Sequence, residues 1–196
     1  LGAPDQSRAP HFRGLDGLRG LSVAGVVLYH LDLPALVGGY LGVSTFFTLS
    51  GYLITTLLLA EFGRTRRVSL PGFWSRRFRR LMPASLLTLA GIVVLFGPFV
   101  ATADQLAELP GDVIAALAYV ANWRFIVADQ SYADLFATPS PVLHFWSLAI
   151  EEQFYWLFPL LTAVVFAAGR GSVKIYAAVL AALLAGSAAT TAMLGY

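Results

Sequence analysis

Ionisable side chains fall within one apolar stretch near the start of the chain, where a charge is costly. Asp16, Arg19 and His30 all lie in residues 15–33. Ionisable groups inside a membrane-spanning helix usually face a cavity or a partner and mark function. In a helix, eleven positions make three turns plus roughly 20°, so Arg19 and His30 share one face about 16 Å apart along the axis. The two side chains cannot touch, and this spacing suits one elongated ligand.

His30 is the side chain best suited to proton transfer near neutral pH. An imidazole in the middle or outer third of a span has no role at the headgroups, so we predict that His30 is catalytic. Arg19 has two interpretations. It binds an anionic part of a ligand, or it extends to the phosphate headgroups at the membrane surface.

A second polar face is predicted at the start of residues 145–168. His144, Ser147 and Glu151 fall on one helical face by the i, i+3, i+7 rule. The adjacent carboxylates Glu151 and Glu152 point about 100° apart, so at most one of them shares that face. Glu151 is the better candidate, either for orienting an imidazole or an acceptor or for pairing with an arginine; for Glu152 we favour the pairing role. His144 is a second candidate base.

Four arginines lie close together in the stretch 73–83, namely Arg76, Arg77, Arg79 and Arg80. Guanidinium groups bind phosphates through planar, charge-assisted hydrogen bonds. Such a cluster equally binds anionic lipids and determines the topology of a membrane protein. Both interpretations remain open for this cluster.

The elements that position these residues are long apolar segments. Hydrophobic residues make up 58% of the 196 residues and charged residues 12%, whereas a soluble domain is roughly a quarter charged. Five segments of about 19 to 24 residues are long enough to span a bilayer; they are 15–33, 40–60, 81–100, 145–168 and 175–196. The sequence therefore predicts an all-α fold, a polytopic transmembrane helix bundle of about five spans.

A sixth, shorter stretch at 113–128 is predicted to be one interfacial or re-entrant helix, the alternative being a short buried helix. Residues 1–14 are predicted to be a cytoplasmic segment, and residues 15–196 the N-terminal part of one membrane domain from a truncated chain. The chain contains no cysteine, which excludes thiolate nucleophiles and thiolate metal sites within it. A net charge of +2 makes nucleic acid an unsuitable partner, and we predict no metal site.

Basic residues predict the orientation of the spans, since Lys and Arg accumulate in short cytoplasmic loops. Residues 61–80 contain seven arginines, whereas residues 101–144 contain five acidic residues against the single Arg124. The first stretch is therefore predicted to be cytoplasmic and the second external. Arg170 and Lys174 then lie inside if residues 113–128 do not cross the membrane.

Four stretches resemble motifs of the acyltransferase-3 family, in the family's order. The first is an arginine and a histidine separated by ten residues, Arg19 and His30, with Arg19 inside the opening Leu15–Gly20. The others are the second-helix signature at 38–55, the arginine-rich loop at 73–83 and the next motif at 144–155. The chain thus resembles the N-terminal half of that family's membrane domain, which has about ten helices. Members commonly carry an acidic residue where this chain has Ser44.

The resemblance implies O-acylation, with acyl-CoA, expected as acetyl-CoA, as the donor co-substrate. The acceptor is a hydroxyl of a carbohydrate or glycoconjugate at the outer face of a bacterial inner membrane, and membrane lipids are further partners. Arg19 and the arginines of 73–83 hold the CoA phosphates. His30 takes the proton from the acceptor hydroxyl or carries the acyl group itself.

A transporter or flippase of a lipid-linked or acylated sugar is the alternative, since charges within the membrane can line a substrate path. Helices broken by Gly and Pro at matching positions of two repeats are typical of such proteins. Here Gly38, Gly39, Gly42 and Gly51 gather around one segment only, which favours the enzyme.

Cysteine labelling tests the predicted topology directly, because the chain has no cysteine of its own. With Ser69→Cys or Ser172→Cys in the full-length protein, we expect a membrane-impermeant thiol reagent to label only from the cytoplasmic side. Labelling of Ser172→Cys from outside would overturn the five-span arrangement.

Overall fold

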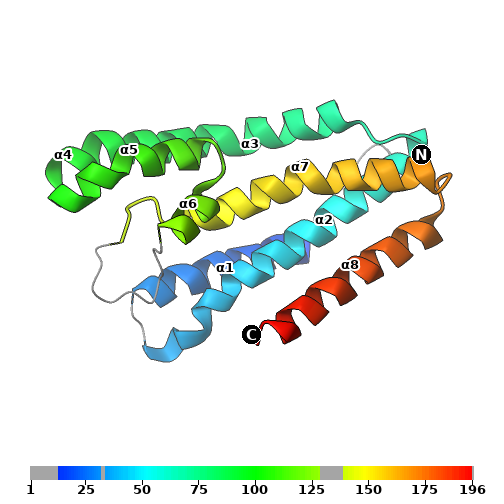
Figure 1. Cartoon of the computed structure of the whole chain (residues 1–196), viewed down its shortest axis with the longest axis horizontal. Coiled ribbons are helices and arrows are strands. Elements are labelled where there is room, and N and C mark those ends of the chain that lie inside the picture. The colour runs from blue at the N-terminus through cyan, green and yellow to red at the C-terminus, as the bar shows by residue number, and fades with distance from the viewer. Residues whose placement is uncertain (1–12, 32–33, 129–138, 196) are drawn as a thin grey trace, which may run out of the picture. The chain divides into compact units, whose positions relative to one another are not determined.

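All regular elements in the described part of the chain are helices (Figure 1). The computed structural model describes residues 13–31, 34–128 and 139–195, and contains no β-strand in them. This confirms the all-α prediction. Several expected features lie wholly or partly outside the described residues: residues 1–12 of the N-terminal segment, Leu33, residues 129–138 of the external stretch, and Tyr196.

Four helical stretches are long and apolar enough to cross a membrane, namely Val37–Thr65, Leu70–Phe99, Phe145–Ala168 and Val173–Met193. They correspond to the last four of the five expected spans. The first expected span forms α1 (Arg13–His30), whose 18 residues include Asp16 and Arg19.

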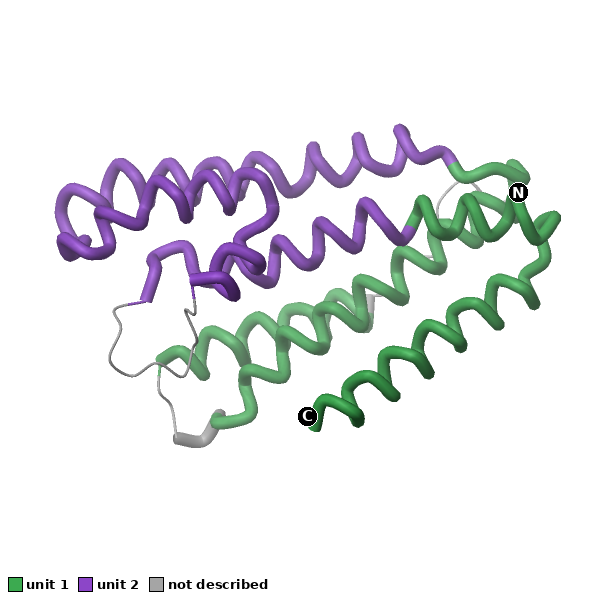
Figure 2. Tube along the Cα trace, in the orientation of Figure 1, with its two compact units in different colours: residues 1–68, 159–196 green, residues 69–158 purple. Residues whose placement is uncertain are grey.

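The chain forms two compact units (Figure 2). The first comprises residues 1–68 and 159–196, and contains α1, the 3₁₀ helix η1 (Pro34–Tyr40), α2 (Leu41–Thr65), the end of α7 (Phe145–Ala168) and α8 (Val173–Met193). The second comprises residues 69–158, and contains α3 (Leu70–Gly91), the π-helix η2 (Ile92–Phe96), α4 (Gly97–Phe99), α5 (Ala103–Leu117), α6 (Ala121–Val127) and the start of α7.

In the first unit, two glycines bring η1 and α2 against the backbone of α1. A Cβ atom at Gly42 would lie 2.5 Å from the carbonyl oxygen of Ser22 and 2.7 Å from Cγ2 of Val26. A Cβ atom at Gly39 would lie 2.7 Å from Cβ of Tyr29. Since real Cβ atoms do not approach this closely, only glycine permits the observed spacing, as in other small-residue contacts between membrane helices.

In the second unit, α3, η2 and α4 follow one another without a gap in the helical stretch 70–99. The stretch 73–83, expected to be a loop, is therefore helical, and the helix begins eleven residues before the expected span. Arginine is a good helix former, so the helix extends beyond its apolar part. Near the other end of this stretch, Pro98 has no N–H to donate. Just before Pro98 the helix widens into a π turn, in which the Gly97 N–H donates to the Ile92 carbonyl.

The expected single helix 113–128 is instead two helices. Helix α5 starts upstream of it, where Thr102 and Gln105 form a reciprocal capping box. Between α5 and α6, Tyr119 adopts a φ of 55°. A left-handed residue interrupts a right-handed helix, so α6 starts afresh at Ala121. Neither helix belongs to the four membrane-length stretches.

Helix α7 contains Pro159, which leaves a helix carbonyl without its usual donor. A proline cannot donate to the carbonyl four residues earlier, here that of Tyr155. The indole Nε1 of Trp74 donates to this carbonyl oxygen at 3.0 Å, and the Trp74 ring packs against Trp156 with centroids 4.5 Å apart. The start of α3 is thus attached to α7 through a carbonyl that the proline makes available.

The close approach of Gly42 to α1 predicts that an alanine lowers the stability of the protein at position 42 but not at position 38. Gly42→Ala should lower the melting temperature of the full-length protein in detergent, because overpacking costs roughly 1 to 3 kcal/mol. Gly38→Ala is the control, since a Cβ there would meet only Cδ1 of Leu41 at 4.0 Å, and alanine otherwise favours a helix. Equal melting temperatures for the two variants would contradict the close contact.

Candidate functional site

His30 is the last residue of α1, and its imidazole is exposed. Its Nδ1 lies 2.8 Å from the carbonyl oxygen of Val26. Because a carbonyl oxygen only accepts, Nδ1 carries the proton in this hydrogen bond. In the neutral ring the lone pair then belongs to Nε2, which can take a proton from a hydroxyl. Tyr29 packs edge-on to the imidazole with centroids 5.3 Å apart.

Arg19 lies in the same unbroken helix as His30 and is half-buried. The axial separation of about 16 Å expected between them therefore applies. Ser22 and Val26 fall on the same face of α1 by the i, i+3, i+4 rule, and both approach Gly42. The face of α1 that carries Arg19 and His30 is thus the face whose position the glycine contact determines.

Among the four clustered arginines of α3, Arg77 has a different environment from the others. Its guanidinium carbon lies 4.6 Å from the ring centroid of Tyr155 and 5.6 Å from that of Phe73, within the range of cation–π attraction. Arg76, Arg79 and Arg80 are exposed. Arg79 donates to the Ser75 hydroxyl at 2.7 Å. The cluster therefore combines one packed arginine with three that reach solvent.

Two adjacent carboxylates on α7 lie near Arg77. The Tyr155 hydroxyl donates to the carboxylate of Glu151. Glu152 is only 2% exposed, and the positive charge of Arg77 lies in its surroundings. Its Oε1 has no hydrogen-bond partner among the described residues. Burial, and secondly the Glu152 charge, raise the pKa of the Tyr119 hydroxyl, which lies between α5 and α6.

His144 immediately precedes α7 and is exposed. The two residues before it, Val142 and Leu143, are buried in the apolar core of the second unit. The Ser147 hydroxyl donates to the His144 carbonyl at 3.1 Å. The backbone of His144 is thus held by a buried segment on one side and by the first turn of α7 on the other.

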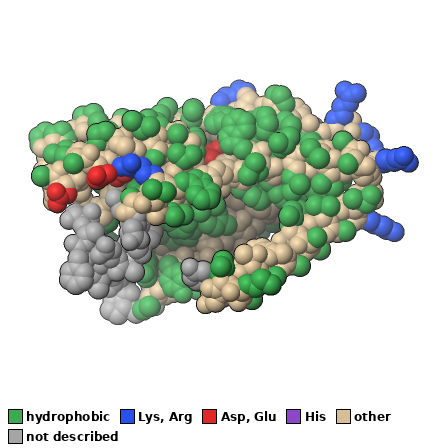
Figure 3. All heavy atoms as spheres, in the orientation of Figure 1, with side chains coloured by type: hydrophobic (Ala, Val, Ile, Leu, Met, Phe, Trp, Pro, Cys, Tyr) green, Lys and Arg blue, Asp and Glu red, His purple; other side chains and the backbone are tan. Residues whose placement is uncertain are grey.

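An ion pair around the buried Asp112, which the sequence analysis did not single out, lies in the second unit. Arg124 donates from Nε to Asp112 at 2.5 Å and from Nη2 to Glu108 at 2.7 Å. Asp112 is 1% exposed and also accepts from the Ser140 hydroxyl at 2.6 Å. Hydrogen bonding to Asp112 is the main cause of the raised pKa of Arg124. Figure 3 shows acidic and basic side chains side by side in the region of α5.

This ion pair joins α5, α6 and the segment that leads to His144. The only signal in the sequence was a single arginine within an acidic stretch. That signal predicted sidedness, but it did not identify Asp112 as the partner.

The predicted site residues divide between the two units. Arg19 and His30 belong to the first unit; the arginines of α3, His144 and Glu151 belong to the second. The structure brings Glu151 together with Tyr155 and places Arg77 over the same tyrosine. In the described ranges, no group of three or more His, Asp or Glu side chains could hold a metal ion.

The family model described as an acyltransferase domain matches residues 12–194. The chain belongs to the acyltransferase-3 family. The match covers both α1 with Arg19 and His30 and the helices α3 and α7 of the second unit.

Relatives of this acyltransferase-3 chain carry the name O-acetyltransferase. The chain is 49% identical over 147 residues to O-acetyltransferase OatA of Staphylococcus aureus strain NCTC 8325 / PS 47, which covers 75% of this chain and 24% of the relative. It is 47% identical over 148 residues to a putative O-acetyltransferase of Staphylococcus aureus strain COL, covering 76% and 24%. The chain thus spans about a quarter of the length of these curated relatives. No solved structure matches it significantly.

The packing of Arg77 predicts that it stabilises the fold more than its neighbours do. Arg77→Ala removes the charge near buried Glu152 and uncovers the Tyr155 ring, so it should cost roughly 1 to 3 kcal/mol of stability. Arg80→Ala, at an exposed position of the same helix, should stay within about 0.5 kcal/mol. Thermal unfolding of the two full-length variants makes the comparison. Equal losses would show that Arg77 is no more than a surface charge.

Proposed function

We propose that this protein is a membrane O-acetyltransferase that moves an acetyl group from acetyl-CoA to a hydroxyl of a carbohydrate or glycoconjugate at the outer membrane face. Membership of the acyltransferase-3 family and the names of the relatives support the reaction class. The observation that carries the assignment of the base is the hydrogen bond from His30 Nδ1 to the Val26 carbonyl.

In the proposed reaction, Nε2 of His30 takes the proton of the acceptor hydroxyl as the hydroxyl oxygen attacks the thioester carbonyl. A carbon–oxygen bond forms and the carbon–sulfur bond breaks. The imidazolium then gives its proton to the departing CoA thiolate. Throughout, the Val26 carbonyl accepts from Nδ1, which keeps the ring oriented.

The same ring is compatible with a second route, in which Nε2 itself attacks the thioester and carries the acetyl group before the acceptor arrives. In this route the Nδ1 hydrogen bond has the same orienting role. Trapping of an acetylated protein after mixing with acetyl-CoA alone distinguishes this route from direct transfer.

The donor is proposed to bind through its phosphates on the cytoplasmic side. In the first unit Arg19 is half-buried on α1, and in the second unit Arg76, Arg79 and Arg80 are exposed on α3; guanidinium groups bind phosphate oxygens through charge-assisted hydrogen bonds. We assign Arg77 mainly to packing, because it already covers the Tyr155 ring. Glu151 and His144 are proposed to orient the acceptor. The protein is proposed to be a multi-pass component of a bacterial inner membrane.

Replacement of His30 tests the proposed base. General base catalysis contributes a factor of about 10² to 10⁴, so His30→Ala in the full-length protein should lose acetyl transfer by that factor while still inserting and binding acetyl-CoA. His144→Ala is the companion variant and should retain part of the activity. If His30→Ala transfers acetyl groups at the wild-type rate, His30 is not the catalytic base, and His144 is the next base to test.

A further inference from the structure

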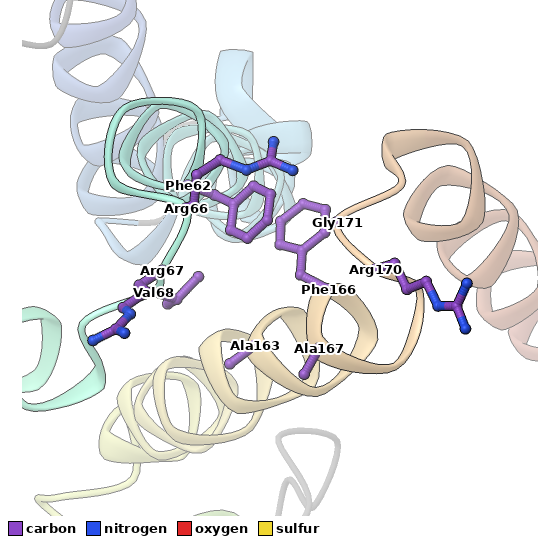
Figure 4. A pocket seen from close by; sticks show the side chains of 9 residues that line it. All are labelled: Phe62, Arg66, Arg67, Val68, Ala163, Phe166, Ala167, Arg170 and Gly171. Atoms are coloured by element: carbon purple, nitrogen blue, oxygen red, sulfur yellow. The ribbon is translucent and has the colours of Figure 1, made fainter.

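A pocket of about 430 Å³ lies within the first unit, where α2 and α7 end and the turn to α8 begins (Figure 4). Its floor includes the aromatic rings of Phe62 and Phe166, and three arginines line it: Arg66, Arg67 and Arg170. None of these arginines belongs to the sites described above. None of the residues that line the pocket is acidic.

The floor of the pocket is rigidly packed. The rings of Phe62 and Phe166 stack with centroids 4.0 Å apart, and the guanidinium of Arg66 lies 4.9 Å from the Phe62 centroid. A Cβ atom at Gly171 would lie 2.9 Å from Cζ of Phe62 and 3.0 Å from Nη2 of Arg66. Arg66 is therefore held between an aromatic face and a glycine backbone, while Arg67 and Arg170 extend outward from the rim (Figure 4).

Neutralising the C-terminal ends of the helices is one role that arginines here could have. Two carbonyls near these helix ends, however, already have backbone donors. The Arg66 N–H donates to the Phe62 carbonyl at 2.8 Å, and the Gly171 N–H donates to the Phe166 carbonyl at 2.8 Å. The guanidinium groups are therefore not needed as caps for these two carbonyls.

The position of the pocket along the helices indicates which anion. Helices α2, α7 and α8 are each long and apolar enough to cross a membrane. The pocket lies at the ends of α2 and α7 and just before α8, and the ends of spanning helices are where lipid headgroups lie. Arginine pairs with phosphate through planar, charge-assisted hydrogen bonds. Basic pockets between membrane helices on the cytoplasmic side suit anionic lipid headgroups.

We propose that this pocket binds the phosphate of an anionic phospholipid headgroup above the rings of Phe62 and Phe166, with Arg66 beside the phosphate and the side chains of Arg67 and Arg170 turning in from the rim to reach it. The proposal goes beyond the acetyltransferase assignment, because it involves neither His30 nor the donor. A soluble phosphate ester has the same chemistry, so the test separates the two sources.

Native mass spectrometry of the full-length protein in neutral detergent measures binding of short-chain phosphatidylglycerol and phosphatidylcholine. We expect phosphatidylglycerol to bind more tightly, and Arg66→Ala/Arg170→Ala to weaken it by about tenfold or more. Arg64→Ala is the matched control, because Arg64 is exposed in the last turn of α2 but does not line the pocket. Arg66→Lys/Arg170→Lys keeps the charge and should retain most of the preference.

Three results would overturn the proposal. One is equal affinity of the wild-type protein for the two lipids. Another is an equal loss in Arg64→Ala, which would reduce the effect to general charge. The third is that binding of glycerol 3-phosphate depends on Arg66 and Arg170, whereas binding of phosphatidylglycerol does not. That result would assign the pocket to a soluble ligand.

Discussion

A polar group on an apolar helix must find its partner inside the protein, because hydrocarbon offers none. Hydroxyl groups meet this constraint locally: Ser22 and Thr55 each donate to the carbonyl one turn earlier. A carboxylate has no proton to donate and needs a donor or a cation from another residue. Glu151 has the Tyr155 hydroxyl. Glu152 lies near the charge of Arg77, and its Oε1 has no hydrogen-bond partner among the described residues. In the second unit Arg77 also joins α3 to α7, because it lies over the ring of Tyr155.

The same constraint explains which parts of the fold can be predicted from sequence. Residues 145–168 were predicted as a span and form α7 with the same bounds, because apolar length alone defines such a helix. Apolar length does not show where a helix continues into water. The arginines of α3 were therefore predicted to lie in a loop, although they occupy its first turns. The break at Tyr119 depends on a backbone conformation that has no signature in hydropathy.

The candidate site also has features that the sequence predicts and features that it does not. The common face of Arg19 and His30 could be predicted because both residues lie in one helix, where spacing fixes direction. The Val26 hydrogen bond that sets the tautomer of His30 could not, since it depends on a side-chain rotamer at a helix end. Nor could the distinction between Arg77 and its neighbours, which depends on the aromatic ring it meets on α7.

Pro159 makes the contact between α3 and α7 specific to one alignment. Leucine and phenylalanine side chains alone would let two helices slide past each other by a residue at modest cost. The Trp74 indole instead donates to a single carbonyl. Moving α3 by one residue turns Trp74 by about 100° and shifts it by about 1.5 Å, which leaves that carbonyl without a donor. Pro159 interrupts the hydrogen bonding of α7 and thereby sets the alignment of α3. Arg77 lies three positions after Trp74, so the same alignment places it over the Tyr155 ring.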